Sequence, residues 1–121
     1  MVRNYKELDV WKNAMDLVEE IYSVTAGFSR DEIYGLTSQI RRAVVSVASN
    51  IAEGCGRRTD KDFVSFLYNA FGSIKEVGCQ LMIAKRLGYL KVGEFEGLED
   101  EADKLAVMLM KFIKRVSGEK V

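Results

Sequence analysis

Apolar side chains recur every three to four residues over four long stretches of the chain, a spacing typical of amphipathic α-helices. We expect helices at about 5–26, 30–53, 60–87 and 93–117. The last stretch carries a regular apolar heptad of Phe95, Leu98, Ala102, Leu105, Leu109, Phe112 and Val116. Because short connections favour antiparallel neighbours, the pattern predicts an all-α, up-down-up-down four-helix bundle that occupies residues 1–121 as a single domain.

Polar and glycine residues between these stretches predict where the helices begin and end. Ser29 is a predicted N-cap, and Glu32 would close a capping box with it at the start of the second helix. Thr59 is the predicted N-cap of the third helix. Gly54 and Gly56 are expected to end the second helix, since glycine is common just after a helix. The chain contains no proline, so nothing in it forces a helix to kink.

The second stretch carries more apolar surface than a helix of a monomer needs. One seam comprises Ile40, Val44, Val47 and Ile51, and the other comprises Val45, Ala48 and Ala52. The first stretch has a similar double stripe. Because an alanine-rich seam lets helices approach closely, we predict that copies of the chain associate through this surface. The residues predicted for the interface or for a structural role are Arg41, Val45, Ala48, Ser49, Asn50, Ala52, Glu53 and Gly54.

Three polar residues of that set, Ser49, Asn50 and Glu53, share one face of the predicted helix. They are suited to hydrogen bonds across an interface, or to general acid–base chemistry, although a single carboxylate without a partner base is weak support for catalysis. Arg41 falls on the alanine seam, where a charge is normally paired across a helix or subunit boundary. We therefore interpret Arg41 as structural.

Composition narrows the classes of function. The chain has no histidine, which excludes His-activated nucleophiles and the common His-containing zinc and di-iron motifs. Cys55 and Cys79 lack CxxC spacing and are expected to be reduced thiols. No apolar run is long enough to cross a bilayer and the first residues lack a signal-peptide core, so we expect a cytoplasmic protein with no membrane partner. We expect no enzyme, no cofactor and no metal.

Residues 46–58, SVASNIAEGCGRR, invite two interpretations. Glycines next to arginines suggest a phosphate-binding loop, but neither GxxxxGK[ST] nor GxGxxG is present and no strand precedes them. The alternative, which we favour for the glycines, is the end of a helix followed by a basic turn.

Six cations are candidates for nucleic-acid contacts: Arg42, Arg57, Arg58, Lys61, Lys75 and Arg86. Residues 39–92 hold nine Lys or Arg against four Asp or Glu, whereas residues 93–105 hold one Lys against six acids. A net charge of zero therefore conceals a basic middle. Lys61, Lys75 and Arg86 share one line of the third helix, which would either follow a phosphate backbone or simply be a solvated face.

The acidic run at 94–103 raises one competing hypothesis, a magnesium-dependent, all-α nucleotide hydrolase. Glu99 and Asp103 lie one turn apart, which is suitable for two ligands of a divalent ion. Acidic residues near a helix start are also favoured by the helix dipole alone, so the run has a structural explanation as well.

Three segments resemble the 23S rRNA intervening-sequence protein family: YKELDVWKNAMDLV, YGLTSQIRRAVVSVASNIAEGCGRR and KDFVSFLYNAFGSIKEVGCQLMIAKRLGYL. The order LTSQIRRAxxSxxSNIAEG is more specific than a general helical pattern. Where the family usually has proline before the SN pair, this chain has Ala48.

The resemblance implies a homopentamer of four-helix bundles around a central channel. It also implies kinship with the accessory variability protein of diversity-generating retroelements, which binds nucleic acid and a reverse transcriptase. We therefore expect an oligomeric, non-enzymatic protein that binds RNA or a ribonucleoprotein weakly. A structural scaffold for other proteins is the alternative, and the magnesium-dependent hydrolase is the third hypothesis.

Overall fold

The computed structural model describes residues 4–118, which form four α-helices, two short 3₁₀ helices and no strand. The α-helices are α1 (Asp9–Thr25), α2 (Leu36–Cys55), α3 (Asp60–Arg86) and α4 (Val92–Ser117). The 3₁₀ helices are η1 (Tyr5–Glu7) and η2 (Arg30–Glu32). The prediction of an all-α bundle is confirmed.

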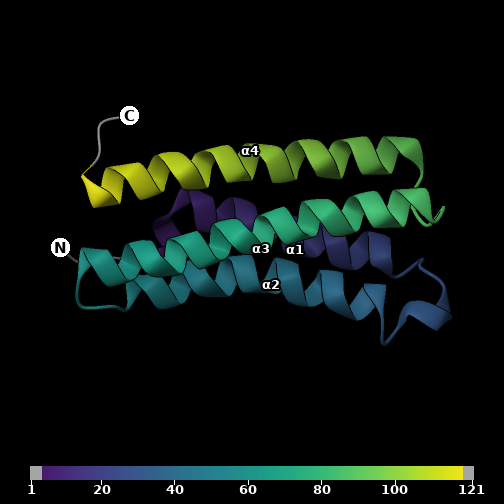
Figure 1. Ribbon diagram of the computed structural model, residues 1–121, viewed down its shortest axis with the longest axis horizontal. Coiled ribbons are helices and arrows are strands. Elements are labelled where there is room, and N and C mark those ends of the chain that lie inside the picture. Colours follow the sequence, from purple (N-terminus) through teal and green to yellow (C-terminus); the bar gives the residue numbers. More distant parts are fainter. Residues whose placement is uncertain (1–3, 119–121) are drawn as a thin grey trace.

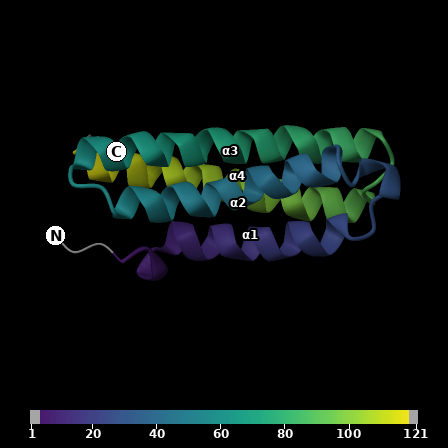
Figure 2. The ribbon, with the colours of Figure 1, turned by 90° about the horizontal axis from the view of Figure 1, so that it is seen from below.

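The helices run alternately up and down along one long axis (Figures 1 and 2). Each helix packs against the next one in sequence, and α1 also packs against α4, whereas within residues 4–118 the Cα atoms of the diagonal pairs stay more than 8 Å apart. The core consists of one aliphatic and aromatic stripe from each helix, with fully buried side chains such as Ile21, Ile51, Leu67 and Leu109. None of the helices in this part of the chain combines the length and the apolar character needed to span a bilayer.

The start of the second helix was predicted too early. The hydroxyl of Ser29 accepts a hydrogen bond from the N–H of Asp31 (3.3 Å), but it caps only η2, and α2 begins at Leu36. The Glu32 carboxylate does not close a capping box with Ser29, because its Oε1 atom accepts from the N–H of Leu36 (3.1 Å). Glu32 therefore caps α2 from the preceding turn.

The same carboxylate ties together the two connections at this end of the bundle. Glu32 Oε2 accepts a hydrogen bond from the hydroxyl of Tyr89 (2.9 Å), which follows α3. The rings of Tyr89 and Phe28 also pack together, with centroids 5.4 Å apart. The hydrogen bond to Glu32, followed by partial desolvation, raises the pKa of the Tyr89 hydroxyl above its usual value. Gly88 follows the end of α3 at Arg86 and adopts a left-handed φ of 82°, which favours glycine.

The other predicted boundaries differ less. α1 begins at Asp9 instead of residue 5, because Tyr5–Glu7 form the separate turn η1. Thr59 caps α3 as predicted, its hydroxyl accepting from the N–H of Asp62 (3.1 Å). Gly54 does not end α2, since the helix continues through it to Cys55, whereas Gly56 caps the helix as predicted.

Candidate functional site

Gly54 lies at a close contact between α2 and α3. A Cβ atom on this residue would lie 2.7 Å from Cδ1 of Phe63 and 3.0 Å from Cβ of Phe66. Both distances are shorter than normal van der Waals contact, so any side chain here would push the helices apart. Glycine at this position thus serves the packing of two helices of the same chain.

The basic turn that follows brings three of the predicted cations together. Arg57 and Arg58 lie between α2 and α3, and Lys61 lies in the first turn of α3. The guanidinium of Arg57 lies over the Phe66 ring, with Cζ 4.4 Å from the ring centroid. Arg58 and Lys61 are exposed, and neither forms an ion pair within residues 4–118. We call Arg57, Arg58 and Lys61 the basic corner.

Arg41 and Arg42 are neighbours on α2 that differ in their contacts. Arg41 donates from Nε to the hydroxyl of Thr25 (2.8 Å) and from Nη2 to the carbonyl of Tyr22 (3.3 Å), and its Cζ lies 4.5 Å from the Tyr22 ring centroid. It thereby satisfies a carbonyl and a hydroxyl at the C-terminal end of α1. This contact fits the structural interpretation of Arg41, with its partners on α1 of the same chain. Arg42 projects into solvent.

The six predicted cations do not form one cluster. Lys75 lies halfway along α3, with Nζ 5.3 Å from the Phe71 ring centroid, and Arg86 is the last residue of α3. Lys61 and Arg86 are 25 residues apart on one helix, a separation of about 38 Å at 1.5 Å per residue. A phosphate backbone could reach the basic corner and Arg86 together only by following the whole length of α3.

The residues predicted for self-association divide into two groups. Ala48 and Gly54 are already buried inside the chain, and Asn50 donates to the carbonyl (2.8 Å) and hydroxyl (3.0 Å) of Ser46 on its own helix. Ser46 in turn shares a hydrogen bond with Ser73 of α3 (2.9 Å). Arg41 and Asn50 are partly exposed, but their side chains bond within the chain. The other residues that are at least partly exposed are Val45, Ser49, Ala52 and Glu53.

An apolar face runs along α1 and α2 on one side of the bundle. Large or apolar side chains are usually buried, but those of this face are partly exposed: Trp11, Met15, Val18, Tyr22, Val45 and Ala52. The double stripe in the sequence indicates this face, and we call it the α1–α2 face. Arg41 is its charged member, and its guanidinium is already held by α1.

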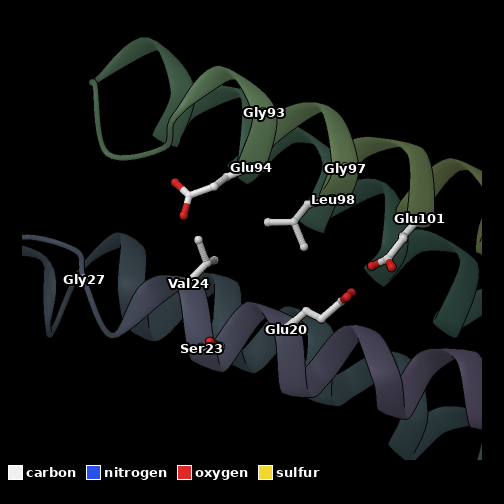
Figure 3. A pocket seen from close by; sticks show the side chains of 9 residues that line it. All are labelled: Glu20, Ser23, Val24, Gly27, Gly93, Glu94, Gly97, Leu98 and Glu101. Carbon is white, nitrogen blue, oxygen red and sulfur yellow. The ribbon is translucent and has the colours of Figure 1, made fainter.

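The opposite side of α1 faces α4 across an acidic groove of about 500 Å³ (Figure 3). Glu20 of α1 and Glu101 of α4 extend toward each other, with Val24 and Leu98 beside them, and Glu94 lies nearer the start of α4 (Figure 3). This groove was not predicted, because its carboxylates lie far apart in the sequence.

The two acids of the magnesium hypothesis lie outside the groove lining. Glu99 is half-buried and Asp103 is exposed, and their neighbour Asp100 is paired with Lys104 (2.9 Å). Within residues 4–118, no three Asp, Glu or Cys side chains come together in a way that could hold a metal ion. The geometry therefore gives the hydrolase hypothesis no ligand set.

The family model of the 23S rRNA-intervening sequence protein matches residues 6–111, which is most of the chain. The chain belongs to this family. A crystal structure of a protein of unknown function, from the S23 ribosomal protein family of Bacteroides thetaiotaomicron, is similar to it with a TM-score of 0.78. The two share 20% sequence identity over 87% of this chain and 98% of that one, so the likeness supports the fold alone. No curated protein sequence matches the chain.

Proposed function

We propose that this family member is a non-enzymatic protein that assembles into a ring of five copies and binds RNA, or an RNA–protein complex, through phosphate contacts. The observation that carries the RNA part is the basic corner, where Arg58 and Lys61 are exposed and have no carboxylate partner within residues 4–118. We also propose that the chain is related to the accessory variability protein of diversity-generating retroelements. That protein binds nucleic acid.

The α1–α2 face is the proposed contact between copies. Val45 is 38% exposed at its centre, and Trp11, Met15 and Val18 are only half-buried. A second copy could cover these apolar side chains and leave Tyr22 and Arg41, at one end of the face, in solvent, so that the guanidinium of Arg41, which bonds only to uncharged groups, is not buried without a counter-charge. Covering apolar surface is the usual source of stability in homo-oligomers.

Assembly and RNA binding are linked in this proposal. One subunit offers few free cations, and each exposed phosphate contact is weak. A ring repeats the basic corner in every subunit, so several contacts to one RNA form at a high effective concentration. Binding should weaken steeply with salt and depend little on base sequence, because phosphate contacts release counterions and carry no sequence information.

The test measures mass by light scattering and RNA binding by a salt titration on the same samples. Val45→Glu should give a species near the chain mass of 13.7 kDa and lose most RNA affinity. Arg58→Gln/Lys61→Gln should keep the wild-type mass and lower the salt slope by about 0.7 for each lost single-strand contact. Arg57 is left intact because its guanidinium packs on Phe66.

Two control variants match these changes. Val107→Glu places the same charge on another exposed valine, on α4, and should leave the mass unchanged. Lys12→Gln/Lys104→Gln removes two positive charges from α1 and α4 and should leave the RNA salt slope unchanged. A monomeric wild type would overturn the ring, and absence of RNA binding at about 50 mM salt, where electrostatic association is strong, would favour the protein scaffold instead.

A further inference from the structure

A second basic region lies at the opposite end of α2 from the basic corner, as a pocket of about 560 Å³. The pocket lies where α1 ends and α2 begins, beside the 26–35 connection at the right-hand end of the bundle in Figure 1. Its volume is within the range of small-molecule sites. Arg30, Arg41 and Arg42 line it, and no Asp or Glu does. None of the three arginines pairs with a carboxylate within residues 4–118.

Arg41 is held in place before any ligand arrives. Its hydrogen bonds to Thr25 and Tyr22 and its position over the Tyr22 ring fix the guanidinium plane. These contacts use Nε and Nη2, which leaves Nη1 as a donor for a ligand. An arginine oriented in advance loses less conformational entropy when it binds an oxyanion.

The start of α2 adds a second feature suited to an anion. Thr37 and Ser38 line the pocket in the first turn of this 20-residue helix, whose first N–H group, that of Leu36, is already bonded to the Glu32 carboxylate. Thr37 is only 7% exposed, and its Oγ1 atom has no hydrogen-bond partner within residues 4–118. That atom has almost no accessible surface, so the hydroxyl offered to a ligand oxygen at this end of the pocket is that of the half-buried Ser38.

The remaining wall of the pocket is apolar and aromatic. Ile33 is 50% exposed there, Tyr22 is also largely exposed, and Phe28 closes the wall from the core side. An oxyanion alone would not need this wall, whereas a ligand with a phosphate and a planar ring would use both parts.

We propose that this pocket binds a nucleoside 5′-phosphate, with the phosphate on Arg41 and Arg42 and the base against Ile33 and Tyr22. A free nucleotide and the 5′ end of an RNA present the same chemistry. If the ligand is the 5′ end of an RNA, the inference rests on the proposed RNA binding. If the ligand is a free nucleotide, it does not. It assigns to Arg41 a ligand contact in addition to its contacts with α1.

The experiment compares 5′-AMP, adenosine and inorganic phosphate by calorimetry on the wild type, Arg42→Gln and Arg30→Gln. We expect 5′-AMP to bind at least about tenfold more tightly than adenosine, and more tightly than inorganic phosphate. Arg42→Gln should lower the affinity for 5′-AMP about tenfold. Arg30→Gln should lower it less, because the proposal places the phosphate on Arg41 and Arg42. Arg115→Gln, at an exposed arginine of α4, is the matched control and should bind as the wild type does. Equal affinity for 5′-AMP and adenosine, or equal effects of Arg42→Gln and Arg115→Gln, would overturn the proposal.

A second arm identifies the source and separates this inference from the proposed function. An RNA 10-mer with a 5′ phosphate should bind the wild type more tightly than the same RNA with a 5′ hydroxyl if the pocket takes RNA ends. Binding of 5′-AMP without that difference supports the pocket and assigns it to free nucleotides. RNA binding that depends on Arg58 and Lys61, with no binding of 5′-AMP, keeps the proposed function and overturns the pocket. Binding of 5′-AMP without any RNA binding keeps the pocket and overturns the proposed function.

Discussion

The chain contains two adjacent arginine pairs, Arg41–Arg42 and Arg57–Arg58, near the two ends of α2. In each pair the first guanidinium packs on an aromatic ring of a neighbouring helix, at 4.5 Å from Tyr22 of α1 and 4.4 Å from Phe66 of α3. The second arginine of each pair is exposed. A basic pair in this bundle therefore consists of one packed cation and one cation open to a ligand.

The surroundings of the two pairs differ. The Arg41 side chain also makes two hydrogen bonds and lies beside an open pocket, whereas the Arg57 side chain makes none within residues 4–118 and only its backbone N–H donates, to the carbonyl of Gly54 (3.1 Å). At the Arg57 end the helices are in such close contact that Gly54 has no room for a methyl group. One end of α2 thus holds a recessed site, and the other presents cations on a tightly packed surface.

The largest effect expected concerns this difference in packing. Gly54→Ala would place a methyl group 2.7 Å from Cδ1 of Phe63 and 3.0 Å from Cβ of Phe66, which must move apart. We expect a loss of about 1–3 kcal/mol in the free energy of unfolding, measured by urea denaturation. Gly72→Ala is the control, since a Cβ atom there meets nothing within 4 Å and should stabilise α3 by about 0.5–1 kcal/mol. If both variants changed stability alike, the close approach would not be the reason for glycine at position 54.

A smaller effect should separate the two packed arginines. Arg41→Gln removes the hydrogen bonds to Thr25 and Tyr22 and should lower the free energy of unfolding by about 1.5 kcal/mol. Arg57→Gln removes an exposed cation–π contact and should cost about 0.5–1 kcal/mol. The same denaturation curves measure both variants, with Arg58→Gln as the unpacked reference. An Arg57 variant as unstable as the Arg41 variant would mean that the hydrogen bonds to α1 contribute little.

The number and course of the four helices followed from the apolar period, because each helix buries one continuous stripe. The start of α2 did not, since Ser29 and Glu32 match a capping box locally. In the structure the Glu32 carboxylate instead accepts hydrogen bonds from the N–H of Leu36 and from the hydroxyl of Tyr89, which lies 57 residues later in the chain. A local rule could not anticipate a partner contributed by the end of α3.

The candidate sites divide along the same line. The structural interpretation of Arg41 followed from its position on the alanine seam, which is a property of one helix. The stacking of Arg57 on Phe66 depends on how α2 and α3 pack, and the acidic groove depends on Glu20 and Glu101 meeting across two helices. Nothing in the sequence marked Arg30 as a candidate binding residue either, because we expected it to be the first residue of the second helix.

The smallest effect concerns the connection between Glu32 and Tyr89, which lies at the same end of the bundle as the pocket. The pKa of Tyr89 is raised above its usual value of 10.0, chiefly by the hydrogen bond that its hydroxyl donates to Glu32. The hydroxyl therefore stays protonated to higher pH in the folded chain than in the unfolded chain. Its contribution to stability is complete below about pH 10 and is lost as the pH rises through the folded pKa.

Tyr89→Phe should thus be less stable than the wild type at pH 8, and the difference should shrink above pH 10. Tyr34→Phe, at a 98% exposed tyrosine, is the control and should follow the wild type throughout. A gap between wild type and Tyr89→Phe that stayed constant from pH 8 to above pH 10 would contradict this prediction, because it would mean that the stabilisation by the hydroxyl does not depend on its proton, the ring packing on Phe28 being the same in both proteins.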